Sequence, residues 1–262
     1  MKALFAESDF ARKVDLTAVN SINFARIAAQ SVYYFTAAAK FAAPPIFVVP
    51  TGNFGDVFAG EAAMRMGLAV EKLVVATNVN DIMARALNDG VYAAGRAAPT
   101  LSPAMDIQVA SNFERALFEA SCRNVAWLSE AMAEFAATKR IVLPDGVHTV
   151  LRARYAARRC DDKQTLATIA RVHAETGRLI DPHTAVGVAA AYNLGEHQKV
   201  PIIVLSTAHP AKFPDAVRAA TGRIPPAPPR LSAVLSAPEK IVDLAADKAL
   251  VRAFIEARLP SL

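Results

Sequence analysis

The chain has 262 residues, of which 53% are hydrophobic and 20% charged, so it carries enough apolar surface for a large core and lies outside the disordered class. Its net charge of +5 is spread without a run of five basic residues, which argues against a nucleic-acid partner. No apolar run reaches the roughly 18 residues of a membrane span, and Cys122 and Cys160 lack zinc-ligand spacing, so we expect a cytoplasmic protein without a metal or a membrane partner.

Stretches with apolar residues at helical spacing alternate along the chain with short apolar runs that are typical of buried strands. In chain order we predict a helix over 20–39, a strand over 46–49, a turn over 50–55, a helix over 56–67, a strand over 72–77, helices over 80–88, 112–139 (a pair), 152–159, 163–176 and 184–194, a strand over 201–206, and helices over 214–221 and 248–258.

These strands lack polar alternation and are separated by helices, which indicates an α/β fold with a mostly parallel sheet flanked by helices. We divide the chain into a helical segment over 1–43, an α/β domain over 44–222, and a proline-rich linker with a C-terminal helix over 223–262.

The most informative residues form the turn Gly52-Asn53-Phe54-Gly55-Asp56, which lies between the first predicted strand and an alanine-rich helix. Glycine lets the backbone approach a phosphate closely, and the first N–H groups of a helix attract anions. Asn53 adds a side-chain donor, and Asp56 can cap the helix. Because plain tight turns share this Gly-x-x-Gly spacing, the residues alone predict only a phosphate-bearing ligand at the carboxyl edge of the sheet.

Six stretches, in this order, resemble sequence blocks of threonine synthases of the bacterial and fungal type. They are 20–27 with Gln30, Tyr33 and Tyr34; 50–56; 76–78 with Asn80 and Asp81; 102–109 with 111–115; 181–187; and 207–213. The resemblance implies a tryptophan-synthase-β-like fold (fold type II) that binds pyridoxal 5'-phosphate (PLP). It also implies a lyase that converts O-phospho-L-homoserine and water to L-threonine and phosphate.

By this resemblance the turn residues Gly52, Asn53, Phe54, Gly55 and Asp56 would hold the PLP phosphate, and Thr207 would hydrogen-bond the ring nitrogen. Residues at the substrate site would be Ser21, Asn23, Arg26 and His209. Without the resemblance, Thr207 is a strand-end hydroxyl bonded to the backbone, and Arg26 fits a helix-surface ion pair equally well. We expect Asp106 and residues 111–112 to cap helices, and His183 to belong to a helix start rather than to contact substrate.

In this family the lysine that forms the aldimine with PLP lies in a Phe-Lys-Asp-like stretch, and none of the ten lysines in this sequence has that context. We therefore interpret the chain as the carboxyl-terminal part of a threonine synthase, inactive unless a missing N-terminal segment or a partner chain supplies the lysine. Two alternatives stay open. One is a related phospho-lyase acting on phosphohomoserine or phosphothreonine, and the other is a lysine-less remnant that binds a phosphorylated ligand without catalysis.

Overall fold

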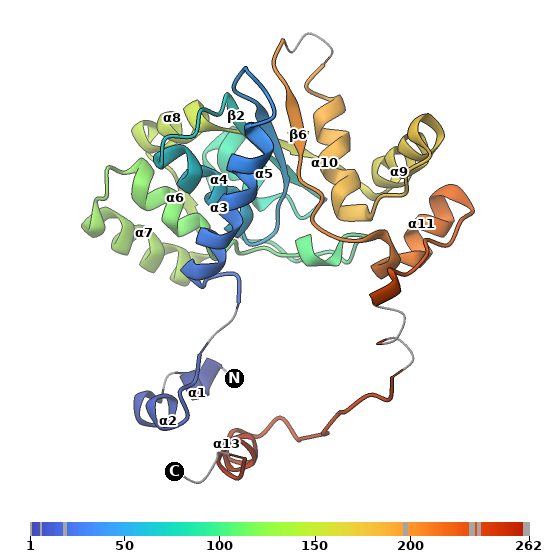
Figure 1. Cartoon of the computed structure of the whole chain (residues 1–262). Coiled ribbons are helices and arrows are strands. Elements are labelled where there is room, and N and C mark those ends of the chain that lie inside the picture. Colours follow the sequence, from blue (N-terminus) through green and yellow to red (C-terminus); the bar gives the residue numbers. More distant parts are fainter. Residues whose placement is uncertain are drawn as a thin grey trace.

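The computed structural model describes residues 2–5, 7–17, 20–195, 199–230, 234 and 237–258 (Figure 1). Its centre is a four-stranded sheet in the order β5-β2-β1-β6, in which all neighbouring strands are parallel. The strands are β1 (Ile46–Pro50), β2 (Lys72–Thr77), β5 (Tyr155–Arg159) and β6 (Ile202–Val204). The prediction of a mostly parallel sheet flanked by helices is confirmed.

Both faces of the sheet are buried, because successive residues of β1 enter different cores. Phe47 and Val49 belong to the larger core, whereas Ile46 and Val48 belong to a second core on the opposite face. The helices α3 (Phe24–Ala38), α4 (Gly55–Arg65), α5 (Ile82–Asp89), α6 (Phe113–Ala120), α7 (Val125–Thr138) and α8 (Asp145–Arg154) contribute to the larger core. The second core is closed by α10 (Pro182–Tyr192), on which α9 (Asp162–Thr176) packs. This two-sided burial explains why the strands lack polar alternation.

The predicted helix over 152–159 is wrong. The helix α8 ends at Arg154, and Tyr155–Arg159 forms the edge strand β5, which pairs with residues Leu73 to Thr77 of β2. Tyr155 and Ala157 are buried, while Arg158 and Arg159 are exposed. Alanine and arginine favour helices locally, whereas the strand is stabilised by pairing with residues about 80 positions earlier in the chain.

Two short strands were not predicted from the sequence. They are β3 (Val91–Ala93) and β4 (Arg140–Val142), which form an antiparallel pair beside the main sheet. The helix predicted over 20–39 begins later, at Phe24, because Asn23 occupies the N-cap position of α3 and its side chain accepts a hydrogen bond from the Ala25 N–H. The other predicted helices and strands are present, with ends shifted by a few residues at most.

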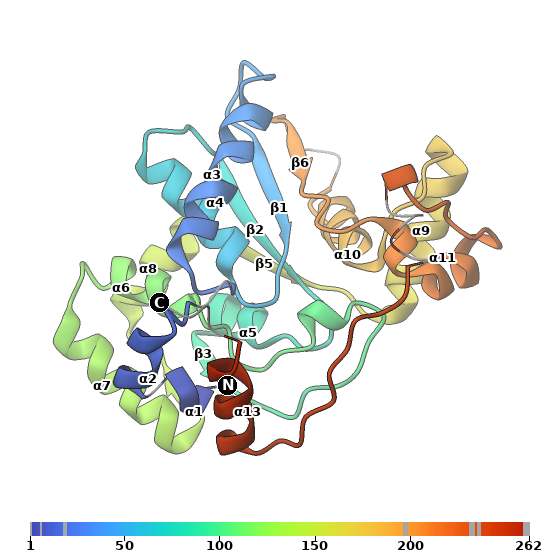
Figure 2. The same cartoon turned by 60° about the horizontal axis from the view of Figure 1, so that its bottom comes forward.

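The two ends of the described chain lie together, apart from the sheet (Figure 2). The short helices α1 (Lys2–Phe5) and α2 (Ser8–Lys13) pack with α13 (Lys248–Glu256). Arg252 donates to Glu7 at 3.1 Å and its guanidinium lies 4.9 Å from the centre of the buried Phe10 ring. The predicted domain division at residues 43 and 222 stays a prediction. No helix in the described ranges is long and apolar enough to cross a membrane.

Candidate functional site

The turn between β1 and α4 presents a row of backbone donors. Phe54 occupies the N-cap position of α4 in the left-handed conformation, with φ of 64°, and the helix begins at Gly55. The backbone N–H groups of residues 52–57 donate to no acceptor in the described part of the chain. Because the helix dipole adds partial positive charge at the same point, the turn is suited to binding an anion.

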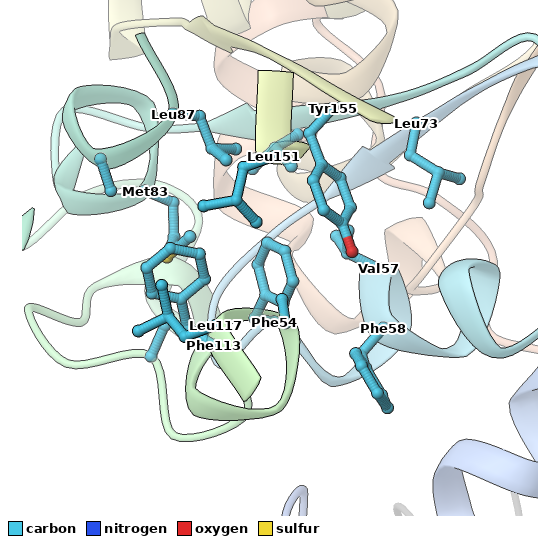
Figure 3. Packing of buried hydrophobic residues seen from close by; sticks show 14 of the residues in the cluster. Phe54, Val57, Phe58, Leu73, Met83, Leu87, Phe113, Leu117, Leu151 and Tyr155 are labelled. Carbon is cyan, nitrogen blue, oxygen red and sulfur yellow. The ribbon is translucent and has the colours of Figure 1, made fainter. Parts of the chain in front are cut away.

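The Phe54 side chain lies in the larger core, near Phe113, Leu151 and Tyr155 (Figure 3). Its ring makes edge-on contacts with Phe113 and Tyr155, at centroid distances of 5.4 and 5.5 Å. Burial of an aromatic side chain of this size contributes on the order of 2–3 kcal/mol. The core therefore holds the strained residue in place, and the backbone of the turn is fixed by packing.

The turn lines a pocket of about 270 Å³. The lining comes from four parts of the chain: Pro50–Val57; Ser21, Arg26 and Gln30; Ala104 and Met105; and His183 with Thr207, Ala208, Lys212 and Phe213. The pocket thus contains every turn residue that the sequence predicted, with Ser21, Arg26 and Thr207. Arg26, Thr207 and Lys212 are exposed, and neither Arg26 nor Lys212 forms an ion pair within the described residues.

Two glycines let the turn approach its neighbours closely. A Cβ atom at Gly52 would lie 2.5 Å from the carbonyl oxygen of Ala104. At Gly55 it would lie 3.2 Å from Nδ2 of Asn112, which donates to the carbonyl oxygens of Ser21 and Asn53. Asn112 was expected to cap a helix; it lies at the N-cap position of α6, but its side chain makes no capping bond and instead ties the turn to residue 21.

Asp56 was also expected to cap the helix, and this expectation is wrong. Its carboxylate accepts hydrogen bonds from the hydroxyls of Tyr33 and Tyr34, the second at 3.3 Å, and makes no N-cap bond. Burial raises the pKa of the Asp56 carboxyl, although the two tyrosine donors oppose this effect.

Ala104 and Met105 of the lining belong to the short 3₁₀ helix η1 (Pro103–Met105), which Asp106 follows. The Asp106 carboxylate accepts from Nδ2 of Asn78 at 2.7 Å and Nδ2 of Asn80 at 2.9 Å, and from the Thr100 backbone N–H at 2.8 Å. Asp106 was expected to cap a helix; it occupies the C-cap position of η1, but its side chain joins this loop to the residues after β2. These hydrogen bonds hold Ala104 and Met105 next to the turn.

The structure places two of the predicted substrate residues outside the pocket lining. Asn23 is the N-cap of α3. His209 precedes the 3₁₀ helix η2 (Pro210–Lys212), which leads into α11 (Pro214–Thr221), and its Nδ1 accepts from the Ala211 N–H at 3.1 Å. Both side chains therefore have local structural roles, and their contact with a substrate stays a prediction.

Ten lining residues were not predicted as site residues: Gln30, Pro50, Thr51, Val57, Ala104, Met105, His183, Ala208, Lys212 and Phe213. All of them except Val57 belong to the six sequence blocks that resemble threonine synthases, so membership of a block indicated the pocket better than the chemical type of the side chain did. In the described part of the chain no cluster of three His, Cys, Asp or Glu side chains could hold a metal ion. Lys212 is the one lysine among the residues that line the pocket.

The chain is similar to proteins of one family. Residues 184–255 match the family model "Threonine synthase, C-terminal". The threonine synthase of Pseudomonas aeruginosa is 45% identical over 259 residues, which cover 97% of this chain and 55% of that protein. The threonine synthase of Saccharomyces cerevisiae is 40% identical over 245 residues, which cover 83% of this chain and 46% of that protein.

Solved structures agree with the sequence relatives. A PLP-bound threonine synthase from Brucella melitensis superimposes with a TM-score of 0.93 at 42% identity, over 98% of this chain and 56% of that one. Threonine synthase from yeast gives a TM-score of 0.88 at 36% identity, over 97% of this chain and 56% of that one. The chain thus spans about half the length of the relatives that it matches.

Proposed function

This chain belongs to the threonine synthase family, and from that premise we propose that it forms the phosphate-binding part of a PLP-dependent threonine synthase site. The reaction proposed for the whole site converts O-phospho-L-homoserine and water to L-threonine and phosphate. The observation that carries the proposal is the row of backbone N–H groups of residues 52–57, which line the pocket without a described protein acceptor.

The residues of the pocket fit the proposed cofactor. The N–H groups of residues 52–57 and the start of α4 match a phosphate, and Asn53 adds a side-chain donor to that subsite. When bound, PLP supplies an electron-withdrawing ring that stabilises negative charge on substrate carbons. Thr207, at the end of the segment after β6, would place its hydroxyl at the ring nitrogen, which leaves that nitrogen largely unprotonated.

The pocket also offers positive charge for the substrate. Arg26 of α3 lines the same pocket, and no carboxylate of the described residues pairs with it. A guanidinium binds a carboxylate or phosphate through two parallel hydrogen bonds, so Arg26 would bind one anionic group of O-phosphohomoserine, with Ser21 beside it. Asn23 and His209 would contact the substrate only if they gave up their present hydrogen bonds, which Asn23 accepts from the Ala25 N–H and His209 from the Ala211 N–H.

Turnover also needs a lysine to link the cofactor and move protons, and no lysine of this sequence has the family's context. We assign that lysine to polypeptide outside this sequence, in a further segment or a partner chain. This chain by itself would then bind the phosphate without catalysis.

Complementation tests this assignment. The purified chain is mixed with the amino-terminal part of a full-length threonine synthase, and phosphate release from O-phosphohomoserine is measured. We expect turnover only in the mixture, and none when the cofactor lysine of the added part is replaced by alanine. Turnover by this chain alone, with borohydride fixing the cofactor on Lys212, would refute the assignment.

A further inference from the structure

A buried Asp–His pair contributes to the lining of the pocket through His183. His183 is 4% exposed and Asp181 is fully buried. Nδ1 of His183 lies 3.0 Å from Oδ1 of Asp181. Burial works against ionisation of Asp181, but hydrogen bonds from His183 and Thr184 outweigh it and lower the pKa of the carboxyl. Since a carboxylate only accepts hydrogen bonds, Nδ1 of His183 carries the proton, and Nε2 is left as an acceptor.

Nε2 of His183 accepts a hydrogen bond from another residue that lines the pocket. The backbone N–H of Ala104, 79 residues earlier in the chain, donates to Nε2 of His183 at 3.3 Å. The carbonyl group of the same residue lies against Gly52, where a Cβ would come within 2.5 Å. One line of contacts therefore runs from Asp181 through His183 and Ala104 to the first glycine of the turn.

The start of α10 also contacts the segment that contains Ser206 and Phe213. Thr184 donates through its hydroxyl to Asp181, and its Oγ1 lies 3.4 Å from Oγ of Ser206, the residue before Thr207. The His183 ring also packs on Phe213, with ring centres 4.7 Å apart. Elements that are far apart in sequence thus meet at one pair of buried polar side chains.

Helix capping does not account for the histidine side chain. Asp181 caps α10 by accepting from the backbone N–H groups of residues 183 and 184, and any residue except proline at position 183 would supply such an N–H. The imidazole adds two bonds that the helix does not need. These are its own bond to Asp181 and the bond from Ala104.

We propose that His183 is a positioning residue, which holds the Ala104 wall against Gly52 and so keeps the N–H groups of residues 52–57 at the pocket. Its effect on ligand affinity rests on the proposed phosphate-binding function. Its effect on the backbone at Ala104 does not, so the two claims can be tested separately.

Two matched variants separate the bonds of the imidazole. In His183→Asn the amide can still donate to Asp181 but is too short to reach Ala104. In His183→Gln the longer side chain can place its oxygen near the position of Nε2 and accept from Ala104. The probe is pyridoxine 5'-phosphate, which carries the phosphate but has no aldehyde to react with surface lysines. Its affinity is measured by calorimetry, and hydrogen exchange is measured at the Ala104 amide.

We expect His183→Asn to bind the probe about tenfold more weakly and to exchange the Ala104 amide about tenfold faster, while His183→Gln stays within about threefold of wild type. The proposal is overturned if His183→Asn matches wild type in amide exchange, or if both variants lose protection equally, which would assign the effect to ring packing on Phe213.

Measurements on wild type separate a failure of the proposed function from a failure of this inference. If the wild-type chain does not bind the probe, the phosphate-binding function fails, and the Ala104 exchange rates of the variants still decide the role of His183. If His183→Asn does not fold, the hydrogen-exchange rate of the Ala104 amide in the wild-type chain decides the role of His183. Protection at Ala104 supports the bond, and exchange at the rate of an unstructured peptide overturns it.

Discussion

Gly52 lies against Ala104 so closely that a methyl group on residue 52 would come within 2.5 Å of the Ala104 carbonyl oxygen. The neighbour is backbone, which cannot rotate away as a side chain could. We expect Gly52→Ala to displace the turn and to weaken pyridoxine 5'-phosphate binding by at least about tenfold, as measured by calorimetry.

Gly146 provides the matched control for this substitution. It lies in the first turn of α8 and is exposed, and a Cβ atom there would meet nothing from outside its own turn of helix within 4 Å. Gly146→Ala should leave affinity unchanged and raise stability by about 0.5–1 kcal/mol. Equal affinities in the two alanine variants would show that close contact at Gly52 does not shape the site.

Asn53 lines the pocket next to the row of N–H donors. If its side chain donates to the bound phosphate, Asn53→Ala removes one charge-assisted hydrogen bond, and affinity for pyridoxine 5'-phosphate should fall about tenfold. The exposed Asn193, at the C-cap of α10, is the control, and Asn193→Ala should bind as wild type does. An unchanged affinity in Asn53→Ala would remove Asn53 from the phosphate subsite.

Asp56 makes stability depend on pH in a particular direction. Burial raises its pKa in the folded protein above the value of about 3.9 for an unfolded Asp, so the folded state binds a proton more tightly. The stabilising effect of that proton is present below about pH 3.9 and is lost as pH rises through the raised pKa.

Urea unfolding of wild type and Asp56→Asn between pH 4 and 8 measures this dependence. We expect wild type to lose stability relative to Asp56→Asn as pH rises. The exposed Asp89 serves as the control for the Asp-to-Asn substitution itself. A gain of wild-type stability relative to Asp56→Asn with rising pH would contradict the assignment.

The Tyr155 hydroxyl donates to Glu61, a buried carboxylate that also accepts from Arg154 at 2.8 Å and Arg65 at 3.1 Å. Tyr155→Phe would leave one buried carboxylate oxygen without that donor, which should cost about 1–3 kcal/mol of unfolding free energy. Tyr192 is exposed and its hydroxyl lies 3.4 Å from Glu175, so Tyr192→Phe should cost less than about 0.5 kcal/mol. Equal losses in both variants would argue against a buried network at Glu61.

The sequence predicted the sheet where burial was strong and continuous. The apolar runs of β1 and β2 lie between breakers and enter two cores, and their strand type was evident before any contact was known. The edge strand β5 was missed because Tyr155–Arg159 carries exposed arginines and helix-favouring alanines, and its strand form depends on pairing with β2. Local propensity cannot report a non-local partner.

The site could be predicted only in part, for a similar reason. Glycine spacing at a strand–helix junction identified the turn, because backbone donors depend on local geometry. Asp56 and Asn112 lie at the start of a helix and Asp106 directly follows the 3₁₀ helix η1, so local rules assigned all three to capping. The structure gives each of them distant partners: Tyr33 for Asp56, Asn78 for Asp106 and Ser21 for Asn112.

The most direct test of the account compares pyridoxine 5'-phosphate with pyridoxine, which differs only by the phosphate. Calorimetry of the purified chain with each compound isolates the phosphate subsite from the ring and avoids lysine adducts. We predict that the phosphorylated compound binds, that inorganic phosphate competes with it, and that pyridoxine binds at least about a hundredfold more weakly. Equal binding of the two compounds, without competition by phosphate, would contradict a phosphate-binding role for residues 52–57.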